Sequence, residues 1–217
     1  MDLTGLKLTN LGIDKSKFGK IYSYVDFGNV NYWFRGDRKD WDEKDLNSNQ
    51  ILIIDLQKLA DFLNCFSTQK RFYYGFNNRN QQSWHLPIKA QRCGFIKITK
   101  PIQFIKHHLS EEELRGIDKP ELLGQDLAGK FIEIPKSNFD VEISVDAVRS
   151  LDNYETFCLL SGDSDFAVLL KYLKRKGKKV IGIASGKVYH SLKEQADLYI
   201  NAQQIKRDIA AIKEIKF

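Results

Sequence analysis

A short apolar run followed by an acidic turn constrains the fold of this chain more than any other feature. Residues 156–160 (Thr-Phe-Cys-Leu-Leu) have the composition of a buried strand, residues 161–166 (Ser-Gly-Asp-Ser-Asp-Phe) form a polar turn, and apolar residues with helical spacing follow. This order is typical of open α/β sheets, where ligands bind at the carboxyl ends of the strands. We therefore expect Asp163 and Asp165 at a ligand-binding edge. Capping of the helix that follows is the alternative role for these two acids.

Further acids are candidates for the same edge. Asp26 follows the apolar run at residues 21–25, and Asp140 stands at the expected start of a helix, where it would also favour the helix dipole. If the strand at 21–25 neighbours the one at 156–160, Asp26 meets the two acids of the turn. Two carboxylates about 4 Å apart repel by roughly 4 kcal/mol at an effective dielectric constant near 20. A bound divalent cation is the simplest way to offset this repulsion, and oxygen ligands suit Mg²⁺ or Mn²⁺.

Strands and helices alternate along most of the chain. Strands are expected at residues 21–25, 71–76, 95–99, 156–160, 180–184 and 198–200, and helices near 81–92, 164–176 and 192–196. Two more helices are indicated by apolar stripes, one with Leu52, Leu56, Leu59, Leu63 and Phe66, the other with Val141, Val145, Val148 and Leu151. The alternation predicts an α/β fold with a mostly parallel sheet that helices cover on both faces.

A single domain is expected over residues 1–217, with its core at about residues 20–203. Two regions depart from the alternating pattern. Residues 101–136 hold three of the four prolines and predict an irregular excursion with a short strand near residues 131–134. Residues 204–217 predict a basic C-terminal helix.

Charge is distributed unevenly, although the net charge is only +6. Residues 62–110 contain no Asp or Glu, whereas residues 137–166 hold seven acids and one Arg. A basic segment beside an acidic focus suits a polyanion held over bound cations, and an unevenly charged solvated surface is the alternative. The candidate substrate contacts from the basic segment are Lys70, Arg71, Arg79, Lys97, Lys100 and Lys106.

Several classes of protein are not supported by the sequence. Residues 1–19 lack the apolar core of a secretory signal, and the most hydrophobic run, residues 51–54, is too short to span a bilayer. The three cysteines are far apart and form no CxxC pair, which predicts free thiols in a reducing compartment rather than a zinc site. No phosphate-binding loop follows a strand. We expect a cytoplasmic protein that does not enter membranes.

Short motifs follow one another over about residues 20–203. They are Val25-Asp26-Phe27-Gly28-Asn29, then Asp140-Val141 followed by Asp146, then residues 161–166, and finally residues 177–180 and 192–200. In this order they resemble the NYN-domain proteins of the LabA-like group, within the PIN-like nuclease superfamily. One departure is Ser-Asn-Phe-Asp before Asp140, where members of the group often have Lys-Gly-Val-Asp; Lys136 is displaced by one residue.

This resemblance implies a PIN-like, Rossmann-like three-layer α/β/α sandwich and metal-dependent cleavage of RNA. Asp26, Asp140, Asp163 and Asp165 would be the metal carboxylates for Mg²⁺ or Mn²⁺, and Asp146 is a further candidate on another face of its helix. Asn29 would be a hydrogen-bonding neighbour in the catalytic centre. Asn31 and Ser161 would be substrate-binding residues, Asn31 as a hydrogen-bonding neighbour beside Asn29 and Ser161 as a support of the turn. The leading hypothesis is an endoribonuclease that acts on single-stranded or loop RNA.

Three alternatives stay open on the sequence. The first is a catalytically silent RNA-binding or adaptor protein on the same fold. The second is a phosphatase of the haloacid dehalogenase type, although the chain has Gly28 where such enzymes use a second Asp. The third is a nuclease of the same fold that cuts DNA. Homo-oligomerisation is possible and is not determined by the sequence.

Overall fold

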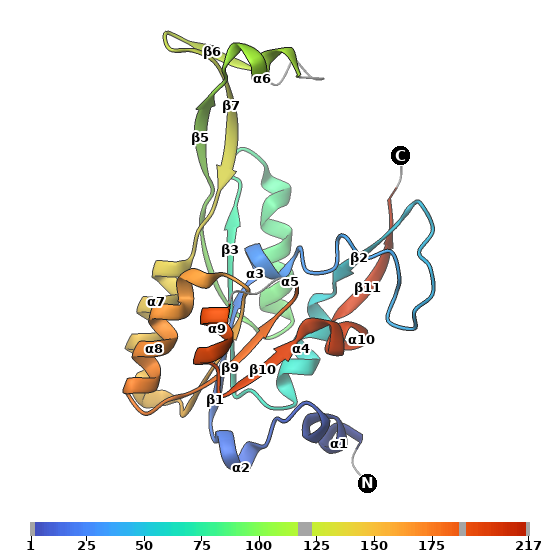
Figure 1. Ribbon diagram of the computed structural model, residues 1–217, viewed down its shortest axis with the longest axis vertical. Helices are drawn as coiled ribbons and strands as arrows, with labels where there is room; N and C mark the ends of the chain where they lie inside the picture. The colour runs from blue at the N-terminus through green and yellow to red at the C-terminus, as the bar shows by residue number, and fades with distance from the viewer. Residues whose placement is uncertain (1–2, 117–122, 187–189, 216–217) are drawn as a thin grey trace.

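A parallel sheet forms the centre of the molecule (Figure 1). The computed structural model describes residues 3–116, 123–186 and 190–215. Six strands lie in the order β10-β9-β8-β1-β3-β4, and every neighbouring pair is parallel. Their bounds are β1 Ile21–Asp26, β3 Gln69–Phe76, β4 Ile96–Pro101, β8 Thr156–Leu160, β9 Lys179–Ala184 and β10 Leu198–Asn201. The predicted pairing of β1 with β8 is confirmed.

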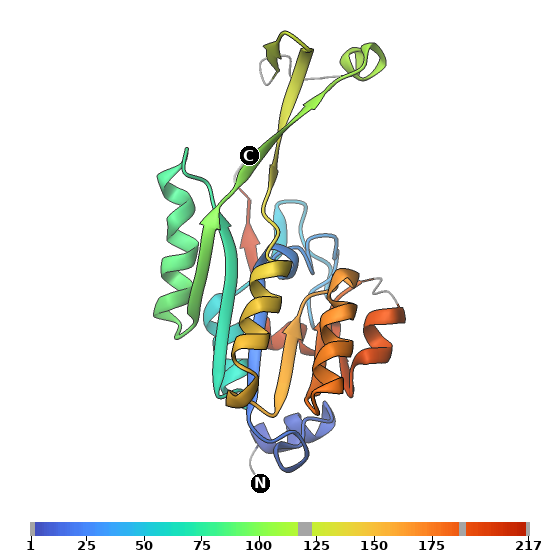
Figure 2. The same cartoon turned by 90° about the vertical axis from the view of Figure 1, so that its left-hand side faces the viewer.

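Helices cover both faces of this sheet (Figures 1 and 2). Along β1, Ile21 and Val25 join one apolar core, whereas Tyr22 and Tyr24 join the other, because successive side chains of a strand point to opposite faces. The first core is covered mainly by α4 (Leu56–Asn64), α5 (His85–Arg92) and α10 (Lys206–Ile209), and the second by α7 (Asp140–Arg149), α8 (Ala167–Arg175) and α9 (His190–Gln195). The predicted sandwich is confirmed. Among the described residues, no helix has both the length and the apolar character needed to cross a membrane.

A second, two-stranded sheet corrects two expectations. β2 (Gln50–Ile54) pairs antiparallel with β11 (Ala210–Glu214), so Leu52 belongs to a strand and not to the helix that begins at Leu56. The basic C-terminal helix expected at residues 204–217 is wrong, because the chain turns through η5 (Ala202–Ile205) and the short α10 into β11. Residues 210–214 contain good helix formers, but pairing with the apolar β2 outweighs such weak local preferences. Residues 216–217 lie outside the described part.

An arm of three antiparallel strands projects from the body (Figures 1 and 2). It contains β5 (Gln103–His108), β6 (Gly124–Asp126) and β7 (Gly129–Lys136) in the order β5-β7-β6, with α6 (Glu111–Arg115) near the tip. The expected irregular excursion is therefore wrong for the described residues, although the short strand expected near residues 131–134 lies within β7; residues 117–122 are not described. The strands exist because β5 and β7 pair with each other across the intervening residues, and no local pattern announces such a partner.

Helix α7 turns an apolar stripe toward solvent. Its buried face consists of Ile143 and Ala147, whereas Val141, Val145 and Val148 are 71%, 42% and 39% exposed. An apolar stripe normally marks the side of a helix that faces the core. The orientation of α7 is set instead by the small and branched side chains at 143 and 147 and by polar contacts made from Asp146, described below.

Candidate metal centre

The carboxyl ends of β1 and β8 place Asp26 beside Ser161. Val25 pairs with Leu160 in the parallel register, so the next residue of each strand lies at the same edge of the sheet. The Ser161 hydroxyl donates a hydrogen bond to Oδ2 of Asp26 at 3.0 Å, and Ser161 is buried. Asp26 thus lies at the edge where open α/β sheets bind their ligands.

Asn29 ties the two strand ends together. Its Oδ1 accepts hydrogen bonds from the Gly162 N–H at 3.1 Å and from the Trp33 indole N–H at 3.0 Å. Two donors occupy this amide oxygen, so Asn29 positions the turn after β8. Asn31 lies at the end of α3 (Phe27–Val30), where its backbone N–H donates to carbonyl groups of that turn.

Three carboxylates gather where two helices begin. Asp140 is the first residue of α7, Asp163 caps η4 (Ser164–Phe166), and Asp165 lies within η4. One oxygen of each acid lies within 4.8 Å of the others, and these three residues are the only such group of metal-binding side chains in the described part of the chain. The ion pairs among the described residues include neither these acids nor Asp26. A set of oxygen donors without a cationic partner fits Mg²⁺ or Mn²⁺.

Helix capping, the alternative role of these acids, is also present. Oδ1 of Asp163 accepts a hydrogen bond from the Asp165 N–H at 3.0 Å, and the Asp163 N–H donates to the Ser161 hydroxyl at 3.2 Å. A carboxylate that caps through one oxygen still offers its other oxygen. Capping and metal binding are therefore compatible at Asp163.

Burial and the charges of neighbouring acids raise the pKa values of Asp26 and Asp140. Burial raises the pKa of Asp26 to about 6, the hydrogen bond from Ser161 acts in the opposite direction, and the charges of Asp140 and Asp163 add to the rise. Burial also raises the pKa of Asp140, and the charges of Asp163 and Asp165 contribute in the same direction. A bound divalent cation would favour the ionised forms and remove the repulsion.

A pocket of about 430 Å³ is lined by three of the acids, Asp26, Asp140 and Asp163. The root of the arm forms part of its wall, and Gly75 permits this close approach, because a Cβ there would lie 2.3 Å from the Ser137 hydroxyl oxygen. The lining residues are Asp26, Gly28, Asn29, Tyr32, Tyr74, Gly75, Ile102, Pro135, Lys136, Ser137, Asn138, Phe139, Asp140 and Asp163. Carboxylates, exposed aromatic surface and one lysine therefore share a single pocket.

Asp146 does not join the acidic group. Its carboxylate forms an ion pair with Arg71 and accepts a hydrogen bond from the Tyr73 hydroxyl. The two side chains of the ion pair are only 15% and 25% exposed, and Arg71 also donates to Ser150 at 3.0 Å. Because this carboxylate is compensated inside the fold, we do not propose Asp146 as a metal ligand.

Most of the predicted substrate-binding cations are engaged elsewhere. Lys70 and Arg71 lie near the start of β3, away from the acidic edge, and Lys70 is only 8% exposed with its ammonium bonded to Asn64. The other candidates lie on β4, the arm and the chain before α5. Of these, Arg79 pairs with Glu133, Lys100 with Glu142 at 2.6 Å and Lys106 with Asp126 at 2.7 Å, while Lys97 is half-buried on β4. Most of these basic side chains are therefore paired with acidic side chains in the fold, although the sequence separates the two kinds of charge.

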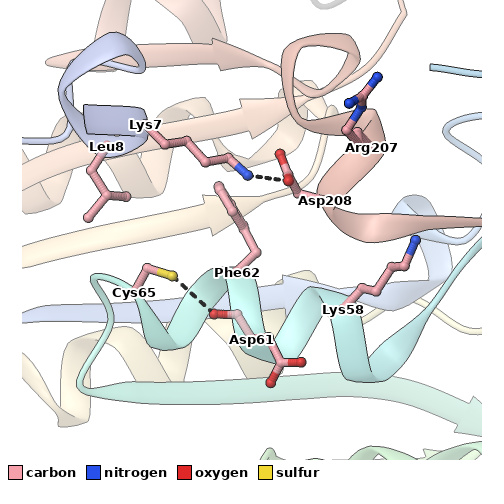
Figure 3. Close-up of a pocket in the computed structure, with 8 residues that line it drawn as sticks. All are labelled: Lys7, Leu8, Lys58, Asp61, Phe62, Cys65, Arg207 and Asp208. Carbon is pink, nitrogen blue, oxygen red and sulfur yellow. Dashed lines mark hydrogen bonds and ion pairs between the residues drawn. The ribbon is translucent and has the colours of Figure 1, made fainter. Parts of the chain in front are cut away.

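A second cavity, of about 410 Å³, lies between α1 (Leu3–Asn10), α4 and α10 (Figure 3). Its cations are already engaged: Lys7 pairs with Asp208, Arg207 pairs with Asp42, and Lys58 donates to a backbone carbonyl at 2.9 Å. None of the clustered acids lines this cavity. The candidate site is therefore the acidic pocket.

Most residues that line the acidic pocket are absent from the sequence-based predictions of the site. Among them are Tyr32, Tyr74, Ser137 and Lys136, to which no role is assigned from the sequence. Tyr32 follows the strand-end motif closely, and Lys136 and Ser137 directly precede the segment that leads to Asp140. The short distance in sequence between these residues and the motifs could have indicated a place in the site. Only the structure shows that the end of the arm lies at the edge of the sheet.

Comparisons with known proteins agree with the family resemblance and with the fold. A family model described as the NYN domain matches residues 20–205. The chain is also similar to the low amplitude and bright protein LabA of Synechococcus elongatus, with 28% identity over 72 residues. That match covers 33% of this chain and 39% of LabA, so the chain spans about two fifths of the length of this relative. A crystal structure of a protein of unknown function from Vibrio parahaemolyticus has the same fold, with a TM-score of 0.59 at 19% identity over 88% of this chain and 96% of that one.

Proposed function

The chain belongs to the NYN domain family, which lies within the PIN-like nuclease superfamily, and from this premise we propose that it is a metal-dependent endoribonuclease. The observation that carries the proposal is the group formed by Asp140, Asp163 and Asp165, whose oxygens lie within 4.8 Å of one another. Acids this close repel each other unless a cation lies between them. Mg²⁺ or Mn²⁺ is the cofactor we propose.

The proposed roles follow from position. Asp140, Asp163 and Asp165 would hold the cation, and Asp26 would add a carboxylate from the neighbouring strand end. A divalent cation in such a site lowers the pKa of a water molecule and stabilises negative charge on a phosphodiester. Ser161 would keep Asp26 in place through its 3.0 Å hydrogen bond.

The phosphate backbone of the substrate needs a cation that is not already paired. Lys136 lines the acidic pocket at the end of β7, and no ion pair of the described residues involves it. We assign it to a substrate phosphate. The free thiols of Cys65, Cys93 and Cys158 suit the reducing cytoplasm that we propose as the place of action.

A cleavage assay with a matched pair of variants tests the proposal. Asp163→Asn should reduce Mn²⁺-dependent cleavage of a labelled single-stranded RNA by about 100-fold or more, because it removes a charge that would hold the cation. Asp152→Asn changes an exposed aspartate outside the pocket and should leave the rate unchanged. Two further reactions complete the set. One uses a DNA strand with the same base sequence, and the other uses the RNA in the presence of EDTA.

Each outcome has a defined meaning. Cleavage that survives in Asp163→Asn contradicts the metal centre. Faster cleavage of the DNA strand would assign the site to a DNA nuclease. RNA binding without any metal-dependent turnover would make the protein a silent binder.

A further inference from the structure

Tyr32 is an exposed aromatic residue beside the acidic cluster. The residue is 58% exposed, and it lines the same pocket as Asp26, Asp140 and Asp163. Among the exposed large apolar side chains of the described residues, only Tyr32 and Tyr172 are aromatic, and Tyr172 does not line this pocket. An aromatic side chain that stays exposed beside a polar pocket is accessible to a ligand that enters the pocket.

The ring is held in place from one side. The guanidinium carbon of Arg35 lies 4.2 Å from the centroid of the Tyr32 ring, which is a cation–π contact. The chain between these residues forms a turn in which the Arg35 N–H donates to the Tyr32 carbonyl at 3.2 Å. Arg35 therefore lies over the ring and places a positive charge beside it, while Tyr32 stays largely exposed.

A ring of this kind is suited to the face of a nucleobase. Stacking between an aromatic side chain and a base is tolerant of sequence, because every base has a π-face. A base inside a duplex already presents both faces to its neighbours, so only an unpaired nucleotide can stack on a protein ring. The pocket volume of about 430 Å³ is of the size that holds a small ligand, and Lys136 at the arm root would meet the phosphate.

We propose that Tyr32, backed by Arg35, is the platform on which an unpaired nucleobase of the substrate stacks beside the acidic cluster. This proposal rests on the proposed nuclease function and narrows its substrate to single-stranded RNA or an unpaired loop. Tyr32 is a substrate-binding residue and takes no part in holding the cation.

Binding measured without cleavage tests the platform. The protein is the Asp163→Asn variant, and the probe is a single-stranded RNA that carries 2-aminopurine, whose fluorescence falls when the base stacks. Adding Tyr32→Leu should weaken binding about 10-fold and abolish the quenching, whereas adding Tyr32→Phe should preserve both. Tyr172→Leu is the control for loss of an exposed ring outside the pocket. The same RNA annealed to its complement should bind more weakly and show no protein-induced quenching.

The result separates the platform from the nuclease proposal. Equal binding and quenching by the Tyr32→Leu protein, or equal affinity for the duplex, overturns the platform even if the wild-type protein cleaves RNA. Absence of any single-strand binding at low salt also overturns it. If cleavage is absent but quenching depends on Tyr32, the nuclease proposal fails and the platform stands. In a cleaving wild-type background, Tyr32→Leu should raise KM more than it lowers kcat.

Discussion

The two aspartates of α7 have different surroundings and different roles. Asp140, at the first position of the helix, faces Asp163 and Asp165 and has no cationic partner among the described ion pairs. Asp146, six residues further along, is clamped between Arg71 and the Tyr73 hydroxyl. The surroundings of each carboxylate therefore decide its role. Asp140 has no cationic partner in the described part of the chain and suits a metal ion, whereas Asp146 is bonded to Arg71 and Tyr73 of β3 and holds α7 against the sheet.

The largest effect expected from this difference is on stability. Asp146→Ala should lower the free energy of unfolding by about 3 to 4 kcal/mol, because it removes the charge partner of the largely buried Arg71 guanidinium and the acceptor of the Tyr73 hydroxyl. Asp140→Ala, at the other end of the helix, should leave the stability of the metal-free protein unchanged or slightly raised. Chemical denaturation of the two variants measures the contrast. Equal destabilisation by both substitutions would show that the two carboxylates do not differ in their contribution to stability.

A pH dependence of stability is the next effect in size. The pKa of Asp26 is about 6 in the folded protein and 3.8 when unperturbed, so between these values the folded state keeps a proton that the unfolded chain releases. Stability of the metal-free protein should therefore fall as pH rises from about 4 to about 7, by at most about 3 kcal/mol from this group. Asp26→Asn should remove that part of the dependence. If the difference between the wild type and this variant is constant with pH, Asp26 is not the titrating group.

Metal ions should produce the smallest of these effects. Mg²⁺ or Mn²⁺ at ten times its dissociation constant should stabilise the wild-type protein by about 1.4 kcal/mol, since only the folded state binds it. The corresponding rise in Tm is about 3 to 6 °C for a protein of this size. Asp163→Asn should abolish the shift, and Asp146→Asn should retain it in the fraction that folds. A shift that persists in Asp163→Asn would place the cation elsewhere.

The acidic edge could be predicted because its signals are local. Each acid follows a recognisable strand or begins a recognisable helix, and parallel strands bring such ends to one edge. The partners of Lys100, Lys106 and Arg79 could not be predicted in this way. They lie 42, 20 and 54 residues away in the chain, so the sequence shows a basic segment where the fold forms ion pairs.

Pairing between residues that are distant in the chain also explains which strands could not be predicted from the sequence. β5 and β11 pair with strands that are distant in the chain, and residues 210–214 have local preferences that favour a helix. Tyr32 illustrates a different limit, because periodicity indicates where apolar residues lie but not which aromatic ring stays in water. Exposure is a property of the assembled pocket.

The pairing of β11 with β2 also has a consequence for the protein during its synthesis. Residue 54 leaves the ribosome long before residue 210, its partner, and the 210 − 54 = 156 intervening steps take roughly 8 to 30 s at typical rates of bacterial and eukaryotic synthesis. Throughout that interval β2, whose Leu52 and Ile54 are buried in the finished protein, lacks the strand that pairs with it. During its synthesis, a chain of this protein therefore has an unpaired apolar strand at residues 50–54 until β11 emerges.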